Sequence, residues 1–222
     1  MSAHAPETSA TRALWRIARA LPPVERAYAL ARFFVLRPKL LAVMDLLLPA
    51  EGALLDVGCG FGLWTAYFAQ MEPARRITGI DASGRRVAIA RDVARTVGIE
   101  ATFVQADVRD LPSEPRFAGA YVLDVLHHVP REDQRPTLER LRDALLPGGS
   151  LVIKDITTEP WPELAFTTVL DRAMVGMDAP LAYRHHDDWR ALLEELGFRV
   201  RVVRVPDVLP YPHVVLSATR RD

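Results

Sequence analysis

The sequence is poor in cysteine and has no excess of charge of either sign. Its 222 residues include one cysteine, Cys59, which excludes an intramolecular disulfide and a site built from paired cysteines. A lone thiol is typical of a reducing compartment, so we expect a cytoplasmic protein. The 28 basic side chains are balanced by 28 acidic ones, whereas proteins that bind nucleic-acid backbones usually carry a clear basic excess. We therefore expect no nucleic-acid partner.

Long hydrophobic runs are also missing. Residues 1–12 lack the apolar core of a signal peptide. The most apolar run, residues 40–48, contains Asp45 and is too short to span a bilayer. We therefore expect no transmembrane segment. A chain of this length suits one α/β domain, and the sequence predicts no particular oligomeric state.

The N-terminal part is basic within this neutral chain. The first 50 residues carry seven basic and three acidic side chains. Residues 1–10 are small and polar without periodicity, which predicts a disordered tail. Helical patterns follow at residues 11–20, 24–36 and 38–48, with prolines between them. We interpret residues 11–48 as an N-terminal helical cap on a main domain at residues 50–222.

Strand and helix patterns alternate from residue 53 onward. This alternation predicts a mostly parallel sheet with helices on both faces. The last two strands have no helix between them, which indicates an antiparallel ending. Residues 157–186 interrupt the alternation, and we interpret them as a lid insertion. The expected strands are 53–57, 76–80, 101–105, 117–125, 150–156, 198–205 and 214–219, and the main helices are 62–71, 83–97, 131–146 with a stop at 147–149, 163–175 and 187–196.

The strongest functional signal is the segment LLDVGCGFG at residues 54–62. A buried strand delivers Asp56, and glycines then stand at every second position, where the missing Cβ atoms let the backbone approach a ligand closely. The spacing G-x-G-x-G differs from the G-x-G-x-x-G of dinucleotide sites, and Asp56 would repel a diphosphate. The pattern favours a ligand with a cationic amino group. A glycine turn that only packs a helix on a strand is the alternative.

Two further acidic residues follow predicted strands. Asp81 comes about 20 residues after the glycine loop, where a carboxylate can accept both hydroxyl hydrogens of a ribose. Asp107 follows the next strand, in a position to accept a hydrogen bond from an exocyclic amine such as that of adenine. A helix cap at Asp81 and a turn residue at Asp107 are the alternative interpretations.

Together these motifs resemble those of the class I S-adenosylmethionine (SAM)-dependent methyltransferases. The segments LLDVGCGFG, GIDAS, QADVRDLP, YVLDVLHHVP and LLPGGSLVIKDI follow one another over roughly residues 50–156. The resemblance implies an α/β fold with a Rossmann-like seven-stranded sheet, in the order 3-2-1-4-5-7-6 with strand 7 antiparallel. It also implies SAM as the cofactor. No helix-borne histidine or acidic motif with zinc spacing accompanies Cys59, so we expect no metal.

The resemblance assigns the cofactor contacts residue by residue. The first acidic residue and the glycine loop would face the methionine part of SAM, the second acidic residue the ribose, and the third the adenine. An aspartate in the tail of the fourth strand would lie at the boundary between cofactor and acceptor. The residues so assigned are Asp56, Gly58, Cys59, Gly60, Gly62, Asp81, Ala82, Asp107, Val108 and Asp124.

Catalytic and acceptor-binding candidates lie further along the chain. His127 and His128 follow the fourth strand, and a base there could take a proton from a hydroxyl or amine acceptor; backbone hydrogen bonding in a turn is the alternative. We assign acceptor contacts to Trp161, Tyr183 and His186, with surface loop or simple packing as the alternative. Further apolar residues that could line an acceptor pocket, or only pack, are Phe166, Met174, Met177 and Trp189.

The sequence thus predicts SAM-dependent methyl transfer to a small, apolar or aromatic metabolite. The C-terminal stretch is similar to small-molecule methyltransferases of bacterial secondary metabolism. The N-terminal arginines are compatible with an acceptor carried on an acidic acyl carrier protein, and equally with a solvated basic face. A non-catalytic SAM-binding partner protein of the same fold is the competing hypothesis, and the glycine spacing disfavours a nicotinamide oxidoreductase. The acceptor atom (O, N or C) and the need for a general base stay open.

Overall fold

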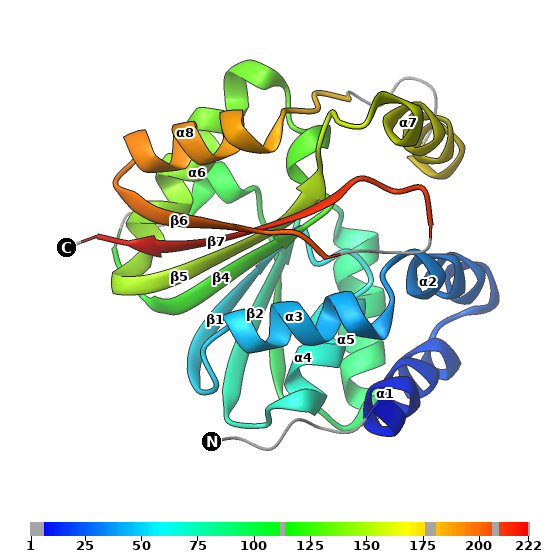
Figure 1. Cartoon of the computed structure of the whole chain (residues 1–222). Coiled ribbons are helices and arrows are strands. Elements are labelled where there is room, and N and C mark those ends of the chain that lie inside the picture. Colours follow the sequence, from blue (N-terminus) through cyan, green and yellow to red (C-terminus); the bar gives the residue numbers. More distant parts are fainter. Residues whose placement is uncertain (1–6, 112–113, 176–180, 206–208, 222) are drawn as a thin grey trace. The chain divides into compact units, whose positions relative to one another are not determined.

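The computed structural model describes residues 7–111, 114–175, 181–205 and 209–221. The chain divides into two compact units, Met1–Asp107 and Val108–Asp222, which we describe separately. The strands follow the order β3-β2-β1-β4-β5-β7-β6 in a seven-stranded sheet (Figure 1). This confirms the strand order implied by the resemblance. None of the helices among the described residues is long and apolar enough to cross a membrane.

The first unit is a three-stranded parallel sheet with helices. Strand β1 pairs with β2, and β2 pairs with β3, all in parallel. The side chains of β1 from Leu54 onward are buried, as the apolar pattern predicts for a strand covered on both faces. The elements are α1 (Glu7–Ala20), α2 (Pro23–Val35), α3 (Pro38–Leu47), β1 (Gly52–Val57), α4 (Leu63–Met71), β2 (Arg75–Asp81), α5 (Gly84–Val97) and β3 (Ala101–Gln105).

The N-terminal helices belong to this unit. Helix α1 packs against α4 and α5, and it buries Leu14 and Ile17. The Arg16 guanidinium donates to the Val97 carbonyl at the end of α5, at 2.8 Å. The helix begins at Glu7, so residues 7–10 are helical where the sequence predicts a disordered tail. Burial of Ala10 in the same packing explains the longer helix.

The second unit contains both parallel and antiparallel strands. Strand β4 pairs in parallel with β5, whereas β7 runs antiparallel between β5 and β6. The antiparallel ending predicted for the last two strands is confirmed. The elements are η1 (Val108–Asp110), β4 (Phe117–Leu123), η2 (Leu126–His128), α6 (Arg131–Ala144), β5 (Leu145–Ile156), α7 (Trp161–Val175), α8 (His186–Glu195), β6 (Phe198–Val203) and β7 (His213–Arg220).

The boundary between α6 and β5 differs from the sequence prediction. The predicted helix stop at residues 147–149 lies inside β5, which already begins at Leu145. Leu145 pairs with Phe117, and the register shifts before Gly119 pairs with Ser150. Cross-strand pairing to β4 therefore draws the residues around the stop signal into the sheet.

Candidate functional site

The glycine loop lies between β1 and α4. The backbone N–H groups of Gly58 and Cys59 both donate to the Ile80 carbonyl of β2, at 2.9 Å each. Gly60 has a φ of +54°, and a Cβ atom built there would meet no atom within 4 Å. Gly60 thus combines a left-handed backbone with open space in front of it, as a site for close ligand approach requires.

Asp81, at the end of β2, holds this loop in place. Its Oδ2 accepts from the Gly60 N–H at 3.0 Å, and its Oδ1 accepts from the Ser83 N–H at 2.8 Å. The Arg86 guanidinium lies 3.9 Å from Oδ2. Although Asp81 is buried, its carboxylate therefore has charged and backbone donors around it. One side chain links the glycine loop to the start of α5.

Two residues of the loop serve packing. Cys59 lies in an apolar cluster with Val87 and Phe103, and burial raises the pKa of its thiol, with the charges of Asp56 and Asp81 adding to the effect. The thiol therefore stays protonated, which does not suit a nucleophile. A Cβ atom at Gly62 would lie 2.9 Å from the Ala90 Cβ atom, so this glycine permits close contact of the loop with α5.

The other acidic candidates of the first unit differ in exposure. Asp56 is buried, and its Oδ2 accepts from the Thr65 hydroxyl of α4 at 2.5 Å. Its carboxylate is thus engaged with the protein on at least one side. Asp107 is half-exposed after β3, and Ala82 is exposed after β2. These positions place Ala82 and Asp107 just beyond the ends of neighbouring parallel strands, as the resemblance implies.

Helix α2 contacts the glycine loop directly. The rings of Tyr28 and Phe61 meet edge to face, with their centroids 5.6 Å apart. Glu25 forms an ion pair with Arg85 of α5, and the next residue, Arg86, lies over the Phe61 ring at 6.0 Å. The helical cap is therefore connected to the loop through α2, while α1 packs on the helices behind it.

A buried ion pair lies where β4 ends. Lys154 of β5 is fully buried, and its ammonium group pairs with the Asp124 carboxylate. The Asp124 N–H also donates to the Lys154 carbonyl, at 2.9 Å, although Asp124 has an unusual positive φ of 52°. The Lys154 ammonium lies 5.1 Å from the centre of the Tyr211 ring. Asp124, a candidate at the cofactor–acceptor boundary, is thus held by its neighbouring strand.

His127 sits between two buried carboxylates. Its Nδ1 forms a hydrogen bond with Asp155 of β5, and its Nε2 lies 3.5 Å from Oδ2 of Asp171 in α7. Burial by itself lowers the pKa of His127, but Asp155, together with Asp124 and Asp171, outweighs this effect and raises it. The imidazole therefore favours its protonated form. His128 is half-buried, and its ring lies 4.1 Å from that of His127.

Two tyrosine hydroxyl groups also lie close to the Asp171 carboxylate. The Tyr183 hydroxyl donates to Asp171 Oδ2 at 2.7 Å, and the Tyr211 hydroxyl lies 3.5 Å from Oδ1. The Tyr183 ring also stacks on His127 at 5.3 Å. Tyr183, a predicted acceptor contact, takes part in this network and does not line the pocket beside the end of β5.

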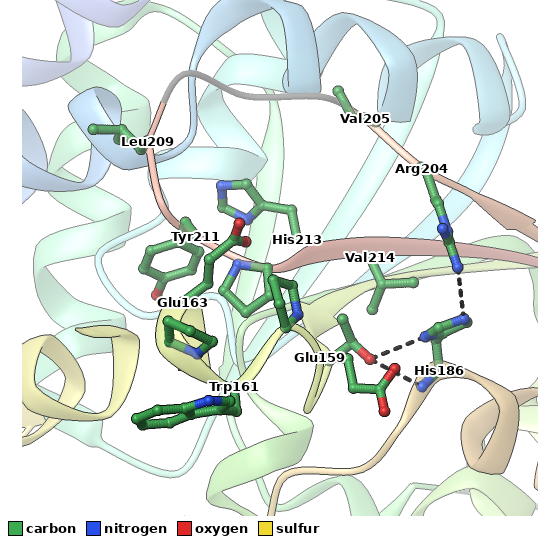
Figure 2. A pocket seen from close by; sticks show the side chains of 14 residues that line it. Glu159, Trp161, Glu163, His186, Arg204, Val205, Leu209, Tyr211, His213 and Val214 are labelled. Atoms are coloured by element: carbon green, nitrogen blue, oxygen red, sulfur yellow. Dashed lines mark hydrogen bonds between the residues drawn. The ribbon is translucent and has the colours of Figure 1, made fainter. Parts of the chain in front are cut away.

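A pocket of about 750 Å³ opens beside the end of β5. Its walls come from the segment after β5, the first turn of α7, the start of α8, the end of β6 and the segment entering β7. Figure 2 shows these side chains converging on one space. Its lining includes Trp161, Glu163, His186, Arg204, Tyr211 and His213.

The structure brings together some of the predicted acceptor residues and separates others. Trp161 and His186 both line the pocket. Trp189 is fully buried in the core, while Phe166 is exposed and is not part of the pocket lining. The Met174 side chain and residue 177 lie outside the described residues.

Sequence reasoning missed the buried charges of the second unit. Lys154 and Asp155 are adjacent in an otherwise apolar strand, LVIKDI, and charged side chains within such a strand are a signal of a buried ionic network. Asp171 lies in the helix α7 and Arg204 just after β6, and each is a charged residue in a mostly apolar segment that the sequence analysis did not single out.

Comparison with known proteins points to one family. The family described as a methyltransferase domain matches residues 54–149, which include the glycine loop, Asp81, Asp107, Asp124 and both adjacent histidines.

Individual relatives agree with this match. The O-methyltransferase cnsE of Penicillium expansum is 36% identical over 157 residues, covering 68% of this chain and 54% of the relative. The methyltransferase GfsG of Streptomyces halstedii is 30% identical over 146 residues, covering 64% of this chain and 51% of the relative. The chain thus spans about half the length of these curated relatives. A crystal structure of the SAM-dependent methyltransferase SibL in its apo form shares the fold, with a TM-score of 0.74 and 22% identity over 92% of this chain and 61% of that one.

Proposed function

Because the chain belongs to the class I SAM-dependent methyltransferases, we propose that it transfers the methyl group of SAM to a hydroxyl oxygen of a small metabolite. One observation carries the proposal: Asp81 binds the Gly60 N–H at 3.0 Å and thereby fixes the open glycine loop at the ends of β1 and β2. This arrangement keeps a carboxylate and an unhindered backbone at one edge of the sheet.

The residues of the first unit fit SAM. The space in front of Gly60 is open to a ligand, and the Asp81 carboxylate is suited to accept from ribose hydroxyls. Asp107 is half-exposed just after β3, where we expect the adenine amine, and Asp56 lies in the strand that leads into the loop. When bound, SAM supplies an electrophilic methyl group on a sulfonium. The protein has to hold cofactor and acceptor in line, which can lower the barrier by roughly 7–11 kcal/mol.

We assign the acceptor to the pocket of the second unit. Trp161 and Tyr211 give it aromatic surface, while His186, Arg204 and Glu163 give it polar groups. Small-molecule sites typically combine an apolar lining with a few converging polar groups. Oxygen as the acceptor atom is supported by the names of relatives, among them the O-methyltransferase of Penicillium expansum.

His128 is the stronger candidate for the base that takes the hydroxyl proton. Both ring nitrogens of His127 face carboxylates, which favours an imidazolium that cannot accept a further proton. His128 is half-buried and keeps some exposure. We assign to His127 the positioning of the loop that carries His128.

Attachment of the acceptor to an acyl carrier protein stays a prediction from the N-terminal arginines. Some of these arginines form hydrogen bonds to backbone carbonyls, and one is buried. Arg16 binds the end of α5, and Arg26 donates to the carbonyls of Ala18, Arg19 and Leu21 at the end of α1. Arg32 is buried. Arg32 is thus withdrawn from the basic surface, whereas Arg16 and Arg26 are exposed and still contribute to it.

Two measurements test the proposed function. Calorimetric titration of the purified protein should give micromolar binding of SAM and its demethylated product, and no binding of NAD. Incubation with methyl-labelled SAM and a small-metabolite extract should then move the label into a low-molecular-weight product. SAM binding without any labelled product would favour the non-catalytic partner protein, and NAD binding would contradict the cofactor assignment.

A further inference from the structure

The pocket of the second unit carries opposite charges on two separate walls. Figure 2 shows Arg204 on one side, beside His186, and Glu163 on the other, beside Tyr211 and His213. These five residues line the same space, and so does Glu159 on the His186 side, whose side chain is 75% exposed and lies 3.6 Å from His185. Such an arrangement is informative about a ligand, because each charge selects a group of the opposite sign at a defined place.

The guanidinium of Arg204 is oriented by a neutral partner. Its Nη2 donates to Nε2 of His186 at 3.2 Å. Across the described ranges, no carboxylate lies within ion-pair distance of Arg204, whereas Arg135, Arg142 and Arg190 in the same unit all pair with carboxylates. The other N–H groups of Arg204 are therefore available to a ligand, and their fork geometry suits a carboxylate.

His186 is itself held in one tautomer by its neighbours. Since Nε2 accepts from Arg204, Nδ1 carries the proton and donates to the Thr157 hydroxyl, at 3.0 Å. The Thr157 oxygen also accepts from the His186 N–H, at 3.2 Å. Burial, with His185 and Arg204 adding to it, lowers the pKa of His186 and keeps the ring neutral. Thr157 and His186 thus fix the direction of the Arg204 side chain.

The opposite wall is suited to a cation. Glu163 is half-buried in the first turn of α7, and no cationic side chain of the described part of the chain pairs with it. Trp161 presents its indole to the same pocket and is 73% exposed. The Glu163 carboxylate lies beside the Tyr211 ring, and a carboxylate together with aromatic rings in one pocket suits an ammonium group. A negative charge also stabilises the first turn of a helix, but this does not require the side chain to face a pocket.

We infer that the acceptor is an aromatic zwitterion, an amino-acid-like molecule whose carboxylate binds Arg204 and whose ammonium group binds Glu163. This inference rests on the proposed function and names its substrate class. A simple acid would leave Glu163 facing an anion or an apolar surface, and a simple amine would leave Arg204 without its counter-charge. Only a ligand with both groups uses both walls, while Trp161 and Tyr211 contact its ring.

Two sets of matched probes separate these possibilities. The first contains L-tyrosine, tyramine and 3-(4-hydroxyphenyl)propanoate, and the second contains the corresponding catechols. Within each set the ring is constant, and only the carboxylate or the amine is removed. Binding is measured by calorimetry on protein saturated with S-adenosylhomocysteine, so that no transfer occurs. We expect the amino acid of at least one set to bind about tenfold more tightly than both truncated probes, since each charge-assisted contact contributes on this scale.

Single substitutions assign each charge to its wall. Arg204→Gln should make the amino acid bind no more tightly than the amine, and Glu163→Gln should make it bind no more tightly than the acid. The matched controls are Arg201→Gln, on the exposed side of β6, and Glu132→Gln, in the first turn of α6. Both controls should leave unchanged the two affinity ratios, amino acid to amine and amino acid to acid. Thermal unfolding of each variant reports whether the fold is intact.

The outcomes also separate this inference from the proposed function. If no amino acid binds more tightly than its truncated probes, or if the two variants leave the ratios unchanged, the zwitterion assignment is overturned. SAM binding and label transfer to another product would then still stand, because neither measurement depends on Arg204 or Glu163. If SAM binding itself fails, the proposed function fails first.

Discussion

The Nε2 atom of His127 lies 3.5 Å from Oδ2 of Asp171, while Nδ1 of the same ring binds Asp155. One imidazole therefore bridges β5 and α7 through two carboxylates. Asp171 also receives the Tyr183 hydroxyl at 2.7 Å. The bridge ties α7, whose first turn lines the pocket of the second unit, to the end of the sheet in that unit.

Protein stability should depend on the protonation of His127. The carboxylates raise its pKa above the ordinary value of 6.5. A raised folded-state pKa adds stability that is fully present below pH about 6.5 and is lost as the pH rises through the folded-state pKa. The difference in the free energy of unfolding between wild type and His127→Asn should thus be larger at pH 6 than at pH 9, as measured by urea unfolding. The half-exposed His185→Asn serves as the control, and a difference independent of pH would contradict the bridge.

The two adjacent histidines should differ in their effect on turnover. His128→Asn should lower kcat and remove an ionisation from the low-pH side of the rate profile, because a base must be deprotonated to act. His127→Asn should lower the stability, with a smaller change in the shape of that profile. Turnover is measured with labelled SAM across pH 5–9. Equal, small effects of both substitutions would leave the base assignment without support.

Asp81→Ala should weaken SAM binding at least tenfold. The substitution removes the acceptor for the ribose hydroxyls and also the acceptor for the Gly60 N–H, and charge-assisted hydrogen bonds contribute about 1.5–3 kcal/mol each. Calorimetric titration with SAM measures the effect. Asp92→Ala removes an exposed carboxylate of α5 that pairs with Arg95 and should leave the affinity unchanged. Wild-type affinity in Asp81→Ala would overturn the assignment of this residue.

Gly60→Val should abolish SAM binding while the protein still folds. A branched side chain would occupy the open space in front of the loop, and the positive φ adds a strain of roughly 1–2 kcal/mol. Gly98→Val is a matched control, because Gly98 also has a positive φ and open space but caps the far end of α5. Both variants should lose similar stability, and only Gly60→Val should lose SAM. Normal SAM binding by Gly60→Val would place the cofactor elsewhere.

The helical cap should matter for transfer more than for cofactor binding. Deleting residues 1–20 removes α1 with its buried Leu14 and Ile17, so we expect lower stability, modestly weaker SAM binding and loss of methyl transfer. Tyr28→Ala is a smaller test, since it removes the ring contact with Phe61 in the glycine loop. Trp15→Ala changes an exposed ring of α1 and is the control. Methyl transfer at the wild-type rate after the deletion would show that α1 is not part of the active site.

Much of the fold could be predicted from the sequence, because the patterns that indicate strands and helix ends lie within short stretches of the chain. Buried parallel strands produce short apolar runs, and a helix ends where glycine or proline follows. β3 therefore spans the residues predicted for it, and α5 differs by one residue at its start. The α6–β5 boundary was less accurate, because pairing of Leu145 with Phe117 overrides a local stop signal.

By itself, the sequence determined the cofactor family and the position of the glycine loop, because the residues of that site follow one another along the first strands of the sheet. Only the tertiary structure decided the environment of His127 and Asp124 and the lining of the proposed acceptor pocket. The charged residues involved come from a strand (Asp155), a helix (Asp171) and a loop (Arg204) that are far apart in the chain. No local sequence pattern predicts which of them become neighbours. The protonation of an imidazole and the charge of a pocket wall depend on such neighbours, since electrostatic interactions act through space.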